Sequence, residues 1–93
     1  MNFEWNTEKA EKNIRKHGIS FQEALTVFQD ALSLAYPDTD HSADEDRYLI
    51  IGLSSFGNVL VISHTFRTDN IRIISARKAT KKERHFYETE STH

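Results

Sequence analysis

The pattern of apolar and polar positions predicts an N-terminal strand followed by a helix. Apolar and polar residues alternate over Phe3–Trp5, as in a strand with one buried face. Asn6 or Thr7 can cap the helix that follows, which is expected over Glu8–His17 because acidic residues there precede basic ones by four positions. Gly18 is expected to end this helix in the left-handed conformation.

A second helix is predicted to start directly afterwards. Ser20 and Glu23 form a capping box, in which each side chain accepts a hydrogen bond from the other residue's backbone amide. Phe21, Leu25 and Phe28 then recur at spacings of four and three, which places them on one face. We expect that face to pack against a sheet.

Short runs of β-branched and aromatic residues predict four more strands. Short polar loops join the last three of them, which suits antiparallel hairpins. The run Val59–Ile62 is apolar on both faces, so its strand is expected at the centre of the sheet. The four strands are expected over Leu32–Tyr36, Tyr48–Leu53, Val59–Phe66 and Asn70–Ala76.

The last helix is predicted to begin at a second capping box, formed by Thr80 and Glu83, and to run to about Glu90. Phe86 is its main apolar residue, so we expect this helix to contact the sheet through Phe86. The elements together predict an α+β fold in one domain over residues 1–93. It contains an antiparallel sheet, two N-terminal helices and a C-terminal helix.

Composition narrows the class of protein. A chain of 93 residues has room for one modest core. The absence of cysteine excludes a disulfide framework and a thiolate zinc site, and it fits a reducing cytoplasm. No apolar stretch approaches the roughly 18 residues of a membrane span, and no basic leader precedes an apolar run. We therefore expect a cytoplasmic protein that does not associate with membranes.

Charge is segregated along the chain, although the formal net charge is only -2. Residues 38–46 form an acidic stretch. The segment from Phe66 to His85 carries seven cationic side chains against two acids, so it can attract a polyanion. The segment Asp38–Ala43 lacks the glycine and the further ligand of a calcium loop, so no metal site is predicted.

Several short segments resemble one known family. The most specific are Lys16-His17-Gly18 and the Ile73–Arg77 segment with Glu83-Arg84 downstream. The others are Phe3-Glu4-Trp5, Ile19-Ser20-Phe21, Pro37-Asp38 to His41-Ser42, Asp46-Arg47-Tyr48 and Ile51-Gly52. On these residues, from Phe3 to about Tyr87, the chain resembles the BrnT family of toxins.

This resemblance implies a RelE-like fold and an endoribonuclease that inhibits translation as the toxin of a type II toxin–antitoxin system. It implies neutralisation by a DNA-binding, BrnA-like antitoxin in a 2:2 complex, with operator DNA bound only through the antitoxin. No cofactor is expected. An alternative is a non-catalytic binding or regulatory module that acts with a DNA-binding partner, because -2 is a low net charge for a ribonuclease acting alone.

Arginine side chains are the first candidates for the chemistry. Metal-independent RNA cleavage by 2'-hydroxyl attack needs a base, an acid and cations that stabilise charge at phosphorus. Arg77, where the last strand meets the helix, is the first choice, and the family motif has its arginine at this position. Arg84 follows on the helix, where a surface ion pair with Glu88 is the alternative. Arg47 is the third candidate, although neighbouring acids can also hold it.

Histidine and tyrosine are candidates for acid–base chemistry. His64 shares a strand face with apolar residues, so a partly buried structural role competes with a catalytic one. His17, at a helix end, and His41, in the acidic loop, are read mainly as structural. Tyr87 lies one turn after Arg84 and is predicted either to act on RNA or to pack.

The remaining cations are expected to bind the RNA backbone, because phosphate contacts supply most of the sequence-independent affinity. Trp5 is expected in the core rather than on the RNA. The predicted backbone-binding residues are Arg67, Arg72, Lys78, Lys81 and Lys82.

Overall fold

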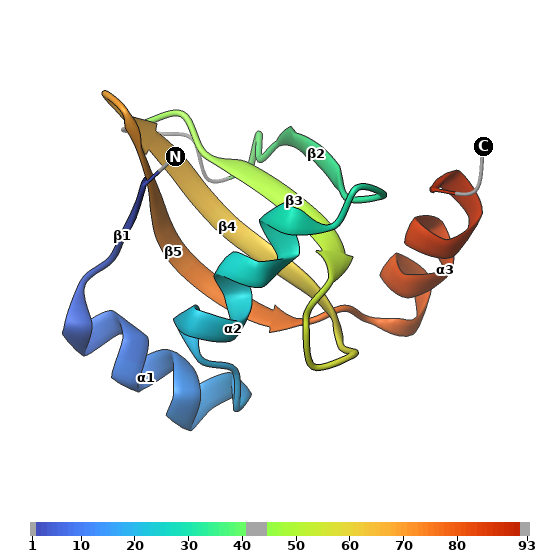
Figure 1. Cartoon of the computed structure of the whole chain (residues 1–93), viewed down its shortest axis with the longest axis horizontal. Helices are drawn as coiled ribbons and strands as arrows, with labels where there is room; N and C mark the ends of the chain where they lie inside the picture. The colour runs from blue at the N-terminus through green and yellow to red at the C-terminus, as the bar shows by residue number, and fades with distance from the viewer. Residues whose placement is uncertain (1, 41–44, 92–93) are drawn as a thin grey trace.

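The computed structural model describes residues 2–40 and 45–91, and it contains a five-stranded sheet in the order β1-β5-β4-β3-β2. Helices α1 and α2 lie together over the sheet, whereas α3 lies at the opposite end of the molecule (Figure 1). The predicted central strand is confirmed as β4. The elements are β1 (Asn2–Glu4), α1 (Thr7–His17), α2 (Phe21–Thr26), the 3₁₀ turn η1 (Val27–Gln29), β2 (Leu34–Pro37), β3 (Tyr48–Leu53), β4 (Val59–Arg67), β5 (Asn70–Lys78) and α3 (Lys81–Glu90).

The prediction of a purely antiparallel sheet is wrong at one edge. β1 pairs with β5 in parallel, with Phe3 opposite Ile71, while the other strand pairs are antiparallel. Parallel neighbours need a long connection, and residues 5–69 lie between these two strands. The α+β class stands, but the sheet is mixed.

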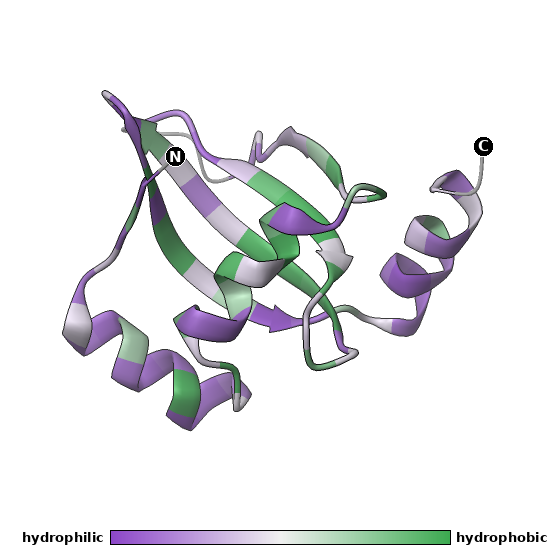
Figure 2. Cartoon of the chain, viewed as in Figure 1, coloured by the Kyte–Doolittle hydropathy of each residue, from purple (hydrophilic) through white to green (hydrophobic). Residues whose placement is uncertain are grey.

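One face of the sheet packs against the N-terminal helices. Figure 2 shows apolar residues along the central strands and α2, while α1 and α3 are mostly hydrophilic. Trp5 contacts Phe21 edge to face, with ring centroids 6.0 Å apart, so its predicted place in the core is confirmed. The buried members of this core are Ile19, Phe21, Ala24, Val27, Ile50, Leu60, Ile62, Ile71, Ile73 and Ala76.

Helix α1 has the predicted caps but buries an unexpected residue. Asn6 accepts a hydrogen bond from Lys9 N–H, and Gly18 ends the helix with φ of 72°. Ile14 is 49% exposed, whereas the amide of Asn13 is buried. That amide donates to the Ala76 carbonyl at 2.8 Å and accepts from Ala76 N–H at 3.1 Å. Asn13 thus supplies β5 with a hydrogen-bonding neighbour beyond the end of β1.

The predicted Ser20–Glu23 capping box is only half formed. Ser20 Oγ accepts from Glu23 N–H as expected. The Glu23 carboxylate instead lies buried and accepts from Ser54 Oγ at 2.6 Å and Asn58 Nδ2 at 2.8 Å. The prediction for this side chain is wrong because two donors in the β3–β4 turn outcompete one exposed helix amide. Glu23 therefore fixes the β3–β4 turn on α2.

The apolar stripe of the second helix also differs from the prediction. Phe21 is buried as expected, but Ala24 and Val27 complete the buried stripe, while Leu25 and Phe28 are only partly buried. The short α2 passes directly into η1, which rotates the positions after Thr26. Similarly, the predicted strand from Leu32 begins only at Leu34, because Leu32 lies in the preceding turn and is 52% exposed.

The other face of the sheet packs against α3 through Tyr87, not through the predicted Phe86. Tyr87 is 8% exposed and packs with Ile51 and Val61, while Phe86 is 45% exposed. The Thr80–Glu83 capping box is confirmed. The capping box fixes how α3 is rotated about its axis, and in this rotation Tyr87, not Phe86, faces the sheet.

We predict that Asn13→Ala lowers the free energy of unfolding by about 2–3 kcal/mol, because it leaves the buried Ala76 N–H and carbonyl without a partner. Urea denaturation of both proteins measures this difference. Lys12→Ala, on the exposed side of the same helix, is the matched control and should change stability by less than about 0.5 kcal/mol. Equal stability of the Asn13 and Lys12 variants would contradict the role of the amide.

Candidate functional site

A β-bulge in β5 determines which way Arg77 points. Ser63 pairs with Ser75 and His64 pairs with Ile73, so Ile74 is an extra residue in β5. Ile71 and Ile73 face the helix-covered core, and strict alternation would send Arg77 to the same side. The inserted residue reverses the alternation. Ala76 enters the core instead, and Arg77 lies on the opposite face.

A cleft of about 560 Å³ lies on that opposite face. Its floor is formed by three consecutive strands, because Leu49 pairs with Ser63 and Ser63 with Ser75. Charged side chains from β5, α3 and the ends of β2 and β3 surround this floor. The lining residues are Asp38, Asp40, Arg47, Leu49, Ser63, Ile74, Ser75, Arg77 and Glu83.

Arg77 and Arg47 reach this cleft from opposite sides of the sheet floor. Arg77 lies near the end of β5, whereas Arg47 immediately precedes β3. Asp38 N–H donates to the Arg47 carbonyl at 2.8 Å, which fixes the residues after β2 beside the start of β3. Arg47 also lies 3.6 Å from the Glu45 carboxylate through its Nε. The predicted association of Arg47 with a neighbouring acid is therefore observed, and Arg47 also lines the cleft.

Glu83 holds the Arg77 guanidinium in a two-pronged ion pair. The two terminal nitrogens of Arg77 donate to the two carboxylate oxygens at 2.7 and 2.9 Å. Glu83 Oε1 also accepts from Thr80 N–H at 2.8 Å, so one carboxylate joins β5 to the first turn of α3. The hydrogen bonds from Arg77, which outweigh the effect of burial, and those from Thr80 lower the pKa of Glu83 to about 2. The hydrogen bonds to Glu83 in turn raise the pKa of Arg77, against the opposing effect of burial.

His64 lies on the other face of the sheet from Arg77. It is 2% exposed, among the rings of Phe28, Tyr48 and Phe66, and its Nδ1 lies 3.2 Å from the Ile62 carbonyl oxygen. Burial lowers the pKa of His64 more than the carbonyl contact raises it. The structure therefore gives the structural alternative for His64 and does not bring this residue to the cleft.

Tyr87 does not line the cleft either. Its phenol donates to Asp30 Oδ2 at 2.5 Å, and burial together with this carboxylate raises the pKa of Tyr87 to about 12. Burial alone would raise the pKa of Asp30, but hydrogen bonds from Leu53 N–H, Tyr87 and Leu32 N–H together lower it. Tyr87 thus holds α3 against the residues around Asp30. This contact corresponds to the packing role, which the sequence left open beside a role on RNA.

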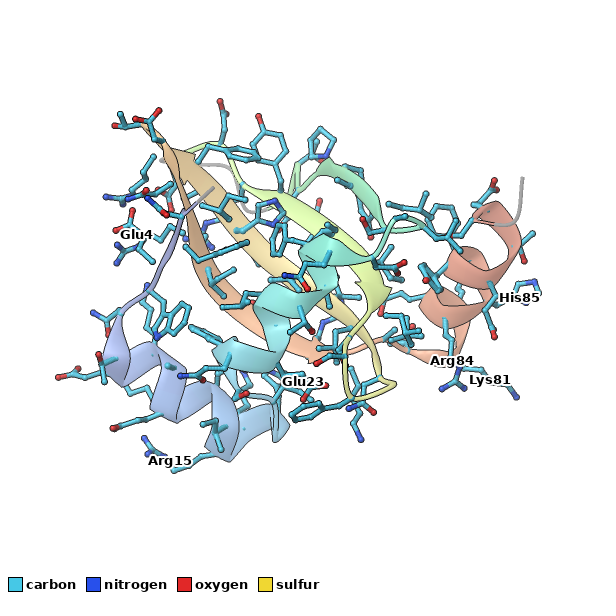
Figure 3. All side chains as sticks on the ribbon, viewed as in Figure 1. Glu4, Arg15, Glu23, Lys81, Arg84 and His85 are labelled. Carbon is cyan, nitrogen blue, oxygen red and sulfur yellow. The ribbon has the colours of Figure 1, made fainter. Side chains whose placement is uncertain are left out.

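Arg84 lies on the exposed surface of α3. Figure 3 shows Lys81, Arg84 and His85 projecting from α3 away from the sheet. Arg84 is exposed and does not line the Arg77 cleft. Tyr87 occupies the position of α3 that packs against the sheet, and Arg84, one turn earlier, lies outside that contact.

The other predicted RNA-binding cations are spread around the molecule. The guanidinium of Arg72, near the start of β5, lies 3.7 Å from the Glu4 carboxylate. The guanidinium of Arg67, at the end of β4, lies 3.7 Å from the Glu45 carboxylate. Lys78 is exposed at the other end of β5. Lys82 is exposed on α3 and lies close to Glu83 in a separate groove.

Two kinds of cleft residue are not predicted from the sequence as members of the site. Asp38 and Asp40 belong to an acidic stretch for which no metal site is predicted, and Glu83 is predicted as a helix cap. A signal for Glu83 was present, since the cap lies six residues after Arg77 at a strand-to-helix junction. For the aspartates, the sequence signal was the family-like segment from Pro37-Asp38 to His41-Ser42, but it is the pairing of β2 with β3 that brings them to the cleft.

His41 lies outside the residues that the structure describes. Within residues 2–40 and 45–91, no three His, Cys, Asp or Glu side chains converge in a way that could hold a metal ion. Over the same ranges, no helix is both long and apolar enough to cross a bilayer.

Comparison with known proteins assigns the chain to a family. Residues 5–83 match the model for the ribonuclease toxin, BrnT, of type II toxin–antitoxin systems. The chain belongs to the BrnT family. The crystal structure of the Brucella abortus ribonuclease toxin, BrnT, shares its fold, with a TM-score of 0.69 and 23% sequence identity. That match covers 87% of this chain and 99% of the Brucella chain. Curated protein sequences gave no significant match.

BrnT membership confirms the resemblance read from the sequence. It makes the chain a member of a family of ribonuclease toxins, and a type II system supplies such a toxin with an antitoxin. In this BrnT-family chain, arginines and carboxylates line the cleft around Arg77 together, on one face of the sheet.

We predict that the stabilisation from the Arg77–Glu83 pair is lost as pH falls from about 4.5 to about 2. The pKa of Glu83 is about 2 in the folded chain against its ordinary 4.5, so this stabilisation is complete above 4.5 and vanishes as the folded carboxylate protonates. Urea midpoints measured between pH 6 and pH 2 should therefore fall less steeply for Glu83→Gln than for the wild type. Glu88→Gln, exposed on the same helix, should follow the wild-type curve. Parallel curves for all three proteins would contradict the pair's contribution.

Proposed function

We propose that this chain is a metal-independent endoribonuclease, the toxin of a type II toxin–antitoxin pair, and that the Arg77 cleft is its active site. The supporting observation is that Arg77 and Arg47 line one cleft together with the carboxylates of Asp38 and Asp40, in a member of a ribonuclease toxin family. In phosphodiester cleavage by 2'-hydroxyl attack, cations can stabilise the charge that builds at phosphorus, and a carboxylate can accept the proton of the 2'-hydroxyl.

Arg77 is the proposed phosphate-binding group. A guanidinium has five N–H donors, and Glu83 accepts one from each terminal nitrogen. The Nε–H and the second hydrogen on the adjacent terminal nitrogen form another two-pronged donor set for phosphate oxygens. Glu83 therefore orients the arginine without occupying all of it. Arg47 adds a second positive charge as negative charge builds on the phosphoryl oxygens.

A carboxylate of Asp38 or Asp40 is the proposed general base. His64 lies on the other face of the sheet, so the described cleft offers aspartates for proton transfer instead. The carboxylate accepts the proton of the 2'-hydroxyl, the 2'-oxygen bonds to phosphorus, and the bond from phosphorus to the 5'-oxygen breaks. The products are a 2',3'-cyclic phosphate and a 5'-hydroxyl that takes its proton from water.

The basic side chains outside the cleft are proposed to collect RNA. Lys78, Lys81, Lys82 and Arg84 are exposed at the end of β5 and on α3. Exposed cations raise the local concentration of a polyanion and make binding salt-dependent. In this account Arg84 contacts backbone phosphates, and Arg67 and Arg72 add weaker contacts because both lie beside acids.

The proposed partner is a DNA-binding, BrnA-like antitoxin. Arrest of translation in the cytoplasm would be relieved when the antitoxin forms a 2:2 complex with the toxin, and operator DNA would be bound through the antitoxin. The acidic residues around the cleft favour a basic segment of that partner. Asp38, Asp40, Glu45 and Asp46 are the described acids of this stretch.

The test is cleavage of a structured RNA by antitoxin-free protein in EDTA. Wild type should cleave it, and Arg77→Ala should reduce the rate by about 10²–10³-fold, as for the loss of one preorganised transition-state contact. Arg15→Ala is the matched control because Arg15 is an exposed arginine on α1 (Figure 3). Its rate should equal that of the wild type.

Two results would contradict the proposal. Wild-type cleavage that survives Arg77→Ala would move the active site elsewhere. Absence of cleavage by a folded wild type, both of free RNA and of ribosome-bound messenger, would instead favour the non-catalytic binding module.

A further inference from the structure

An apolar groove adjoins the Arg77 cleft. It has a volume of about 540 Å³ and lies between the edge strand β2 and α3. Tyr36 and Phe86 supply aromatic rings, and Lys82 supplies a positive charge. The lining residues are Leu34, Ala35, Tyr36, Lys82, Glu83 and Phe86.

The groove and the cleft are continuous through shared residues. Glu83 lines both of them. Tyr36 pairs with Leu49 across β2 and β3, and Leu49 is part of the cleft floor. Burial and the Glu83 carboxylate raise the pKa of Tyr36, partly offset by Arg77, so its phenol lies within the electrostatic field of that ion pair. A nucleotide whose phosphate is bound at Arg77 would therefore have this groove beside it.

From this arrangement we propose that the groove binds an unpaired nucleobase of single-stranded RNA next to the phosphate bound at Arg77. The inference rests on the proposed function.

The chemistry of the groove fits a base. Sequence-tolerant binding of single strands combines a positive backbone-binding surface with aromatic side chains on which bases stack. Tyr36 and Phe86 provide the rings, and Lys82 provides a cation at the groove itself. A volume of about 540 Å³ lies within the range of small-ligand sites, which is about 300–1,000 Å³. The side chains of Leu34 and Ala35 add apolar surface.

Two short 2'-O-methyl RNA oligonucleotides test this inference, because they cannot undergo 2'-hydroxyl attack. One carries bases throughout, and the other has the same backbone with abasic positions. Fluorescence anisotropy measures the affinity of each for the antitoxin-free protein. The wild type should bind the base-bearing strand about 5- to 150-fold more tightly than the abasic strand, the range expected for one stacked base.

Variants locate the base-dependent part of that affinity. Tyr36→Leu and, independently, Phe86→Ala should remove most of the preference for bases and leave abasic binding unchanged. Tyr36→Phe should retain the preference because it keeps the ring. Phe66→Ala is the matched control, since Phe66 is a 54% exposed aromatic residue on the sheet face opposite the cleft, next to His64. Arg77→Ala should weaken binding of both strands.

The outcomes separate this inference from the proposed function. If Arg77→Ala weakens both strands but Tyr36→Leu and Phe86→Ala keep the wild-type preference, the groove does not bind a base and the proposed site stands. If these two variants lose affinity for the antitoxin and none for RNA, the groove is a protein-docking surface and the inference is overturned. If the wild type binds neither strand, or binds both equally, the inference is overturned, and the cleavage assay on free and ribosome-bound RNA decides the proposed function separately.

Discussion

The reversal of side-chain alternation in β5 is the constraint on which the rest of the candidate site depends. Strict alternation would place Arg77 on the same face as Ile71 and Ile73, in an apolar core that excludes an unpaired guanidinium. The extra residue at Ile74 sends Ala76 into that core and Arg77 to the open face. A β-bulge leaves one residue unpaired in the hydrogen-bond ladder between two strands. Bulges are common beside functional sites because they redirect a side chain.

Two polar side chains maintain this geometry from opposite sides of the strand. Asn13 bonds both backbone groups of Ala76, the residue directly before Arg77. Glu83 holds the arginine side chain and caps α3 with the same carboxylate. The position of the guanidinium is therefore coupled to helix α1, to strand β5 and to helix α3. Stability and the proposed function share these contacts, so variants at Asn13 and Glu83 should affect both.

Local patterns predicted the elements well, and long-range pairing explains most of what they missed. Gly18 and the Thr80–Glu83 box marked helix ends correctly because capping is a matter of neighbouring residues. The parallel β1–β5 pair and the arrival of Asp38 at the cleft depend on segments far apart in the chain. The bulge left a faint trace in the sequence, since the buried residues Ile71, Ile73 and Ala76 break strict alternation. Arg77 and Arg47, which both line the cleft, were candidates from residue type and position. For His64 and Tyr87, the sequence alone could not separate a catalytic role from packing, because it does not show which face of the sheet each residue contacts.

A double-mutant cycle on the cleavage rate tests most directly whether Arg47 and Arg77 serve one active site. The rates of wild type, Arg47→Ala, Arg77→Ala and the double variant would be measured on the same RNA in EDTA. Residues that act as a unit are non-additive, so each single variant should lose at least about 10-fold and the double variant less than the product of the two losses. A wild-type rate for Arg47→Ala, or losses that multiply fully, would contradict a shared site in the cleft.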